Sequence, residues 1–259
     1  MKFDCPSEYI GFAAELADTA GEVIRHHFRS SLTVDRKLDN TPVTIADRDA
    51  EEAMRRLIHE RFPKHAILGE EFDEVTSDSD LCWVLDPIDG TKSFISGRPI
   101  FGTLISLVHS GTPILGIIDQ PILGERWIGA EGYPTTFNGK HSKSRNCDDL
   151  DDAILNTTSP DLFKGADKTK FARLSSSVWH TQYGGDCYAY ATLASGFLDI
   201  VVEANLKAYD FCALAPVVSG SGGAISDWRG DPLTRGSDGR VVAVGDSTML
   251  PKVIEILSK

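Results

Sequence analysis

Two aspartates, Asp86 and Asp89, follow an apolar run within the segment WVLDPIDGTKSF at residues 83–94. Pro87 restricts the backbone between them, so their carboxylates can converge on one point. The carbonyl oxygen of Ile88 can join them, and oxygen donors of this kind are the ligands that Mg²⁺ prefers. The segment therefore indicates a divalent metal site at the end of a strand.

The next two residues, Gly90 and Thr91, give the same segment groups that can hold a phosphate. Backbone N–H groups at the start of a helix attract anions, and the Thr91 hydroxyl follows them in the chain. A solvated turn is the alternative interpretation of the letters DPIDG, since aspartate, proline and glycine are common in turns. The apolar run before the turn and further carboxylates elsewhere favour the metal site.

Three of these further carboxylates stand out by their position. Glu70 ends the strand-like run HAILG, Asp47 follows VTIA, and Asp210 lies in YDFCALAPVVSGSGG. Taken alone, Glu70 with Glu71 would be a solvated strand end, and Asp47 would be the N-cap of a helix. The metal site therefore depends on all of these acids meeting in the folded chain.

The secondary structure that must bring the acids together changes along the chain, from helices to strands and then to alternating strands and helices. Apolar residues recur at helical spacing over residues 7–28, with Ser7 as the expected cap, and over residues 47–62, where Pro63 ends the helix. Short runs bounded by turn formers then predict successive strands of a mainly antiparallel sheet. From about Asp151 onward, strands alternate with helices.

This change divides the chain into two closely joined halves. We expect residues 1–147 to form an N-terminal α+β half that carries most of the metal site. Residues 148–259 are expected to form a C-terminal α/β half that adds one metal ligand and the substrate specificity. No linker rich in proline, glycine or serine separates them, which indicates a single compact catalytic unit.

Charge and composition exclude several other classes of protein. The formal net charge of −12 disfavours nucleic-acid binding, because such a surface repels phosphate backbones. The five cysteines are scattered without the spacing of a zinc site, which indicates free thiols in a reducing compartment. The sequence shows no signal peptide and no membrane-spanning run. We expect a soluble cytoplasmic protein, or one from an organelle stroma if a transit peptide has been removed.

Four segments, VTIAD, GEE, WVLDPIDGT and YDFCALAPVVSGSGG, together resemble the inositol monophosphatase family. They occur in the family order, and the match spans nearly the whole chain. The resemblance implies a layered αβαβα fold that combines α+β and α/β parts, and usual assembly as a homodimer. It also implies a lithium-sensitive phosphatase activity that requires Mg²⁺, with two or three ions in each site.

The same resemblance implies a role for each site residue. The implied metal ligands are Glu70, Asp86, the carbonyl of Ile88, Asp89 and Asp210. The implied catalytic residues are Asp47, Thr91 and Glu70, of which Asp47 and Thr91 would orient and deprotonate the attacking water. The amides of Gly90 and Thr91 would hold the phosphate. Lys37 stands where the family often has a lysine near the metals, although a solvated loop lysine is an equal alternative.

The segment at residues 183–211 resembles the histidinol-phosphatase branch of the family, most clearly in GGDCYAY and in LKAYD, where Ala208 replaces the usual proline. The favoured reaction is hydrolysis of L-histidinol phosphate to L-histidinol and phosphate, in histidine biosynthesis. This substrate carries an ammonium group, with which carboxylates at Asp186 and Glu203 would pair. Asp186 could instead cap the helix that begins at Cys187, and Glu203 could be a surface residue at a strand end.

Two other functions stay open at this stage. An inositol-1-monophosphatase or a broader sugar and polyol monophosphatase would use the same metal site, because other side chains recognise the leaving alcohol. A catalytically inactive, phosphatase-like binding protein would usually have lost a metal ligand. All of the implied ligands are present here, so the sequence favours an enzyme.

Overall fold

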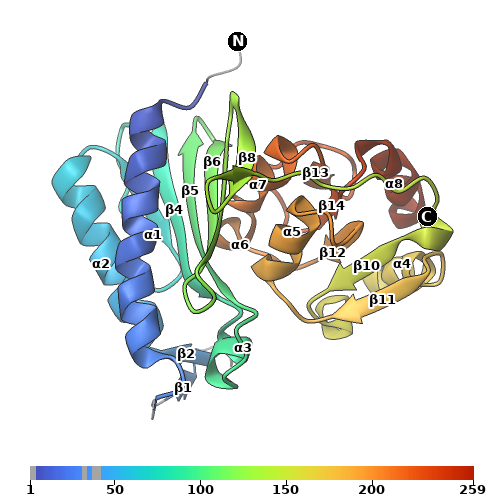
Figure 1. Cartoon of the computed structure of the whole chain (residues 1–259), viewed down its shortest axis with the longest axis horizontal. Coiled ribbons are helices and arrows are strands. Elements are labelled where there is room, and N and C mark those ends of the chain that lie inside the picture. The colour runs from blue at the N-terminus through green and yellow to red at the C-terminus, as the bar shows by residue number, and fades with distance from the viewer. Residues whose placement is uncertain (1–3, 31–33, 37–41) are drawn as a thin grey trace.

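The protein is described here from a computed structural model that covers residues 4–30, 34–36 and 42–259. Its elements form successive layers of helix, sheet, helix, sheet and helix (Figure 1). The long helices α1 (Ser7–His27) and α2 (Ile45–Arg61) form one outer layer, and α4 (Ala166–Ser175) and α8 (Leu250–Ser258) form the other. This arrangement confirms the layered αβαβα fold.

The first sheet has seven strands in the order β3-β4-β5-β6-β7-β8-β9, which is also their order in the chain. Only β3 and β4 are parallel, so the prediction of a mainly antiparallel sheet is confirmed. The strands are β3 (Ala66–Gly69), β4 (Leu81–Asp89), β5 (Gly102–His109), β6 (Thr112–Gln120), β7 (Glu125–Ala130), β8 (Tyr133–Phe137) and β9 (Lys140–His141). A short antiparallel pair, β1 (Val34–Arg36) and β2 (Pro42–Thr44), precedes α2.

The second sheet has five strands in the order β11-β10-β12-β14-β13, so its chain order and its spatial order differ. These strands are β10 (Ile154–Thr157), β11 (His180–Tyr183), β12 (Ile200–Glu203), β13 (Ala224–Asp227) and β14 (Val241–Val244). The other helices are α3 (Thr91–Ile95), α5 (Cys187–Ala194), α6 (Ala208–Phe211) and α7 (Leu214–Gly220), with short 3₁₀ turns η1 (Leu150–Asp152), η2 (Pro160–Leu162) and η3 (Ser247–Met249).

Each layer boundary contains its own apolar core. Phe12 and Leu16 of α1 and Met54 of α2 are fully buried against Trp83 and Leu85 of β4. A second core lies between the two sheets and contains α5 and α7, and a third packs α4 and α8 against the outer face of the second sheet. Burial on both faces explains why the strands of the first sheet read as continuous apolar runs.

Both predicted N-terminal helices are present, but their starts differ from the prediction. Ser7 does not cap α1, because it is already helical, and Pro6 occupies the N-cap position without a side-chain hydrogen bond. α2 begins two residues before the predicted Asp47. Thr44 is its N-cap, and Asp47 at the third helical position accepts a hydrogen bond from the Thr44 amide at 2.8 Å. This reciprocal capping box makes Asp47 part of the helix start without being the N-cap itself.

Helix α7 lies directly against the first sheet, and two glycines allow this close approach. A Cβ atom on Gly116 of β6 would lie 1.9 Å from the carbonyl oxygen of Ala213. A Cβ on Gly129 of β7 would lie 2.3 Å from the carbonyl oxygen of Pro216. No side chain larger than hydrogen fits at either position, so the two halves of the chain are in backbone contact.

Three further predictions concern the cysteines, membrane-spanning helices and the segment around Lys37. All five cysteines are buried free thiols, as the sequence indicated. Within the part of the chain that the structure describes, no helix is both long and apolar enough to cross a bilayer. The candidate Lys37 and the turn predicted at Asn40 lie outside the described residues.

Candidate metal centre

The end of β4 brings Asp86 and Asp89 together. In a regular strand, residues three positions apart point to opposite faces of the sheet. Here Asp86 pairs with Leu104 of β5 but Asp89 pairs with Gly102, so three steps along β4 match two along β5. This β-bulge turns the second carboxylate toward the first. The segment DPIDG is therefore the buried end of a central strand, and the interpretation as a solvated turn is wrong.

Three hydrogen bonds fix the irregular backbone at the bulge. The Thr103 hydroxyl donates to the carbonyl of Pro87 at 2.8 Å, and the Ile88 amide donates to Asp86 Oδ1 at 3.0 Å. The Thr91 hydroxyl donates to the carbonyl of Ile88 at 3.1 Å. A carbonyl oxygen has two lone pairs, so the Ile88 carbonyl keeps one for a metal ion.

Asp210 joins these two aspartates from the other half of the chain. One carboxylate oxygen from each of Asp86, Asp89 and Asp210 lies within 4.8 Å of the other two. Asp210 stands in α6, where the Lys207 amide donates to its Oδ2 at 2.6 Å. The Cys187 amide at the start of α5 donates to Asp89 Oδ2 at 2.6 Å. Two helices of the second half thus orient carboxylates of the centre.

The acids of the cluster lie close enough to raise one another's pKa values. Burial, followed by the charges of Glu70 and Asp89, raises the pKa of Asp86 well above its usual value. Burial is also the main cause that raises the pKa of Asp89 well above normal and that of Asp210 to about 7. A divalent cation would compensate this charge and return the carboxylates to their ionised form.

Asp47 of α2 lies at the edge of the cluster and is 1% exposed. Burial raises its pKa, hydrogen bonds from Thr44 lower it, and the nearby charge of Glu70 raises it again. The Thr44 amide and hydroxyl both donate to Asp47 Oδ2, while Oδ1 is buried and has no hydrogen-bond partner among the described residues. A buried acceptor of this kind is a place for a bound water molecule or ion.

Gly90 and Thr91 form the turn between β4 and α3, and the predicted helix start is confirmed. Gly90 is the N-cap, with a left-handed φ of 95°, which favours glycine. A Cβ on Gly90 would lie 2.9 Å from Asp186 Oδ2 and 3.1 Å from Phe101 Cβ. The turn therefore lies directly beside the Asp186 carboxylate.

Asp186 occupies the N-cap position of α5, but its side chain makes no capping hydrogen bond. The capping explanation for this carboxylate therefore fails. Its backbone has φ 45° and ψ −134°, which residues other than glycine rarely adopt. Burial and then the charge of Glu203 raise the pKa of Asp186, Lys92 and Arg98 lower it, and the net value is about 7.

Glu203 ends β12 and is 3% exposed, so the alternative of a surface glutamate is wrong. Its Oε1 accepts a hydrogen bond from the Thr158 amide at 3.1 Å, and its Oε2 accepts one from the Tyr190 hydroxyl at 3.2 Å. The Thr158 hydroxyl in turn accepts a hydrogen bond from the Asp186 amide at 3.1 Å. Thr158 thus connects the backbone of Asp186 to the Glu203 carboxylate.

The sequence analysis did not identify Thr158, Tyr190 or Cys187 as site residues. Cys187 and Tyr190 lie in GGDCYAY, the segment that resembles the histidinol-phosphatase branch, and Thr158 lies in NTTSP at residues 156–160. Three of the four interactions use backbone amides, those of Thr158, Asp186 and Cys187, which no residue type reveals. The only sequence signal for these residues was their place in those segments.

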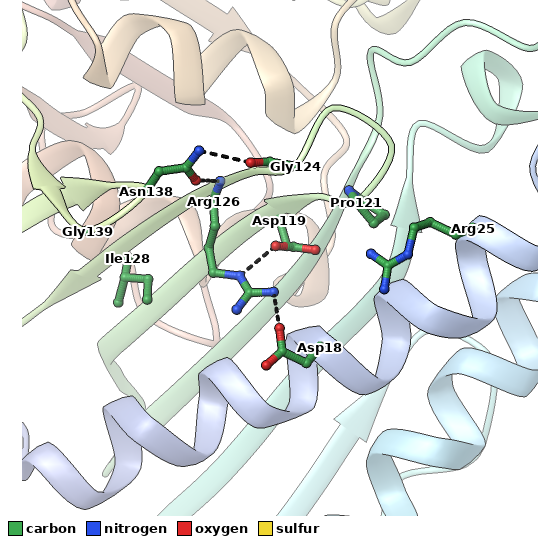
Figure 2. Close-up of a pocket in the computed structure, with 9 residues that line it drawn as sticks. All are labelled: Asp18, Arg25, Asp119, Pro121, Gly124, Arg126, Ile128, Asn138 and Gly139. Atoms are coloured by element: carbon green, nitrogen blue, oxygen red, sulfur yellow. Dashed lines mark hydrogen bonds and ion pairs between the residues drawn. The ribbon is translucent and has the colours of Figure 1, made fainter.

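A separate cavity of about 360 Å³ lies between α1 and the strands β6 and β7 (Figure 2). Arg126 donates to Asp119 at 2.6 Å and to Asp18 at 2.8 Å within it, so its charge is largely compensated by its neighbours. Asn138 accepts a hydrogen bond from the Arg126 amide at 2.8 Å. None of the candidate site residues lines this cavity, so it is not part of the metal centre.

The donors at the acidic cluster fit Mg²⁺. Ligand oxygens on opposite sides of one Mg²⁺ ion are about 4 Å apart, so oxygens within 4.8 Å of one another suit one ion or a close pair. The donors are carboxylates and a carbonyl, and the described part of the cluster contributes no imidazole or thiolate ligand. The unpaired Oδ1 of Asp47 adds an acceptor for water beside them.

Comparison with known proteins shows which family has this arrangement. The model of the inositol monophosphatase family matches residues 6–259. The chain belongs to the inositol monophosphatase family. Within the family, it is 51% identical over 251 residues to the bifunctional phosphatase IMPL2, chloroplastic, of Arabidopsis thaliana, covering 93% of this chain and 72% of that protein. It is 36% identical over 233 residues to the histidinol-phosphatase of Chlorobaculum parvum, covering 89% and 90%.

Solved structures of inositol monophosphatases show the same fold. An inositol monophosphatase from Zymomonas mobilis superposes with a TM-score of 0.90 at 46% identity, and the match covers 98% of each chain. The protein is thus a phosphatase of the inositol monophosphatase family, a metal-dependent family, with an acidic cluster that can hold metal ions. A phosphate ester is the substrate that corresponds to this activity.

Proposed function

We propose that this protein is a Mg²⁺-dependent phosphomonoesterase that hydrolyses L-histidinol phosphate to L-histidinol and phosphate. The observation that carries the proposal is the pair of acids Asp186 and Glu203: Thr158 binds both the Asp186 amide and the Glu203 carboxylate, and the Asp186 carboxylate lies beside the turn at Gly90. Glu203 is buried and Asp186 is partly buried, Lys92 and Arg98 lower the pKa of Asp186, and the ammonium group of this substrate would add a further cation beside the two acids. Relatives named histidinol-phosphatase, 33–36% identical to this chain, support the same substrate.

The proposed metal site uses the side chains of Glu70, Asp86, Asp89 and Asp210 and the carbonyl of Ile88 to hold two or three Mg²⁺ ions. When bound, Mg²⁺ neutralises the ester and lowers the pKa of the attacking water. The geometry favours these donors because the bulge in β4 and the start of α6 direct three of the carboxylates to one point. Glu70 contributes through its charge on Asp86.

The proposed catalytic groups act on the water and the phosphate. Asp47 Oδ1, which is buried and unpaired among the described residues, accepts a hydrogen bond from the attacking water. Thr91 donates its hydroxyl proton to the Ile88 carbonyl, so its oxygen is available as a second acceptor. The amides of Gly90 and Thr91 hold the phosphate at the start of α3. We retain Lys37 as a candidate phosphate contact on the sequence resemblance alone.

A second candidate is an inositol or broader polyol monophosphatase. The observation that favours it is the similarity, at 46% identity, to the inositol monophosphatase from Zymomonas mobilis. An inositol ring has no cation to pair with Asp186 and Glu203, which is why we rank it second.

Turnover of L-histidinol phosphate and of inositol 1-phosphate with Mg²⁺ separates the two candidates. We expect a higher kcat/KM for L-histidinol phosphate. The variant Asp186→Ala should lower that value by roughly 10- to 100-fold, the loss expected for one charged hydrogen bond, and change turnover of the inositol ester less. Asp161→Ala, which removes an exposed aspartate from the same half, is the matched control. Preference for the inositol ester, or equal losses on both substrates, would contradict the assignment.

We also propose a homodimer. Tyr183 and Phe197 are 54% and 69% exposed and line a cavity of about 280 Å³ together with Ile100, an exposed apolar area that a second copy would cover. Light scattering should give the mass of two chains, and Phe197→Glu should give the mass of one.

Cytoplasm or an organelle stroma is the proposed location, and the Arabidopsis relative named chloroplastic supports the second of these.

A further inference from the structure

The proposed mechanism leaves one fully buried acid of α2 unexplained. Glu51 is 0% exposed, lies one helical turn after Asp47 and shares its face of the helix. Burial raises the pKa of Glu51, and hydrogen bonds from the Glu71 amide and from Arg55 lower it. A carboxylate is buried to this extent only where specific partners compensate its desolvation.

The partners of Glu51 are backbone amides directly after Glu70. The Glu71 amide donates to Glu51 Oε2 at 2.8 Å, and the Phe72 amide donates to Oε1 at 3.3 Å. Arg55, one turn further along α2, donates its Nε to Oε1 at 2.7 Å. The Glu51 carboxylate therefore binds the chain and the arginine at the same time.

Arg55 binds the carbonyl groups of the same short segment. Its guanidinium donates to the carbonyl of Phe72 at 3.0 Å and to that of Asp73 at 3.1 Å. The Arg55 guanidinium also lies over the Phe72 ring, 5.7 Å from the ring centroid, which is within the distance of about 6 Å for a cation–π contact. The ion pair of Glu51 and Arg55 thus binds both the N–H groups and the carbonyl groups of the backbone after Glu70.

The backbone before Glu70 is held by the same carboxylate. A Cβ atom on Gly69 would lie 2.0 Å from Glu51 Oε1, so the chain at Gly69 packs directly on the carboxylate. Glu70 therefore lies between two residues that both contact Glu51. Its backbone has little freedom to shift relative to α2, the helix that also carries Asp47.

We propose that Glu51, together with Arg55, is a positioning residue that fixes the backbone on both sides of Glu70 and so sets the affinity of the centre for Mg²⁺. The inference rests on the proposed metal site and not on the identity of the phosphate ester. It also gives a reason for placing Asp47 and Glu51 on one helix face, since a single rigid element then orients the water-binding carboxylate and a metal ligand. Partners that orient metal ligands typically contribute 10- to 100-fold in metal affinity.

The test measures Mg²⁺ binding without substrate, by isothermal titration calorimetry with Mg²⁺ alone. Glu51→Gln keeps the shape of the side chain but removes the charge and one acceptor, and we expect it to raise the Kd for Mg²⁺ by roughly 10- to 100-fold. Arg55→Lys keeps the charge but loses most of the hydrogen bonds and should raise the Kd less. Glu52→Gln, at the adjacent and exposed position, is the matched control and should bind Mg²⁺ like the wild type.

Thermal unfolding in EDTA accompanies the titration. Glu51→Gln with a lower melting temperature but a wild-type Kd would show a merely structural role and overturn the inference. If Glu51→Gln does not fold, an unchanged Kd for Arg55→Lys would overturn it instead. A wild-type protein that binds no Mg²⁺ would overturn the proposed function and this inference with it, whereas wild-type binding that neither variant weakens would overturn this inference alone.

Discussion

At the scale of single residues, the centre is distinguished by acids that destabilise one another. Asp86, Asp89 and Asp210 each have a raised pKa, with burial as the largest cause. Such a cluster costs folding free energy unless a cation or bound protons neutralise it. The protein therefore gives up stability at this position for the ability to bind ions.

This cost predicts how the stability of the metal-free protein depends on pH. The pKa of Asp210 is about 7 in the folded chain and 3.8 ordinarily, so between these values the folded state retains a proton that the unfolded state has lost. The free energy of unfolding should then fall as pH rises from about 4 to 7, by up to about 1.4 kcal/mol per pH unit for one retained proton. Thermal unfolding in EDTA at pH 5, 6 and 7 measures this slope. Asp210→Asn should show a shallower slope, and equal slopes would contradict the prediction.

At the scale of elements, the turn from β4 into α3 joins the proposed metal ligands to the carboxylate of Asp186, which we propose binds the substrate. Gly90 has a left-handed φ, and its missing side chain leaves room for Asp186. The β-bulge before the turn and the helix after it are both short, so a small displacement at Gly90 moves groups on either side. We therefore expect a change at Gly90 to affect function more than folding.

Gly90→Ala tests that sensitivity. The left-handed conformation should cost about 1–2 kcal/mol of stability, and the contact with Asp186 should lower phosphatase activity by at least roughly tenfold, since misplacement of catalytic groups is costly. Gly139→Ala is the control, because Gly139 also has a positive φ of 76° but no atom within 4 Å of an added Cβ. It should lose similar stability and keep its activity. Similar activity losses in both variants would show that backbone strain alone is responsible.

At the scale of the whole molecule, the site exists only because the two halves meet. Asp86 and Asp89 come from the first sheet, whereas Asp210 and the amide that binds Asp89 come from α6 and α5. Helix α7, which directly follows α6, packs on Gly116 and Gly129 of the first sheet. This contact sets the distance between the carboxylates of the first sheet and Asp210.

Gly116→Ala should push α7 away from the first sheet, because the new Cβ would overlap the Ala213 carbonyl. We expect a loss of about 1–3 kcal/mol in the free energy of unfolding and weaker Mg²⁺ binding, as Asp210 moves away from Asp86. Urea denaturation and calorimetric Mg²⁺ titration measure the two effects. Gly11→Ala in α1, where an added Cβ meets no atom within 4 Å, should instead gain about 0.5–1 kcal/mol. Wild-type Mg²⁺ affinity in a folded Gly116→Ala variant would contradict this account.

The sequence by itself determined the parts that depend on local pattern. Helical periodicity located α1 and α2 to within two residues at their starts, and the change to short apolar runs located the first sheet. The strand that ends in Asp86 and Asp89 was recognisable because a buried apolar run leading into two acids is uncommon in a surface turn. The resemblance of four segments gave the family and the fold.

Only the tertiary structure decided how these parts combine. Residues three apart in a strand ordinarily diverge, and no sequence signal placed the bulge that brings Asp86 and Asp89 together. The hydrogen bonds of Glu203 with the Thr158 amide, of Asp89 with the Cys187 amide and of Glu51 with the Glu71 amide all use backbone groups distant in the chain. Amides and carbonyls are the same at every position of a sequence, so which of them meets a given side chain is fixed only when the layers pack.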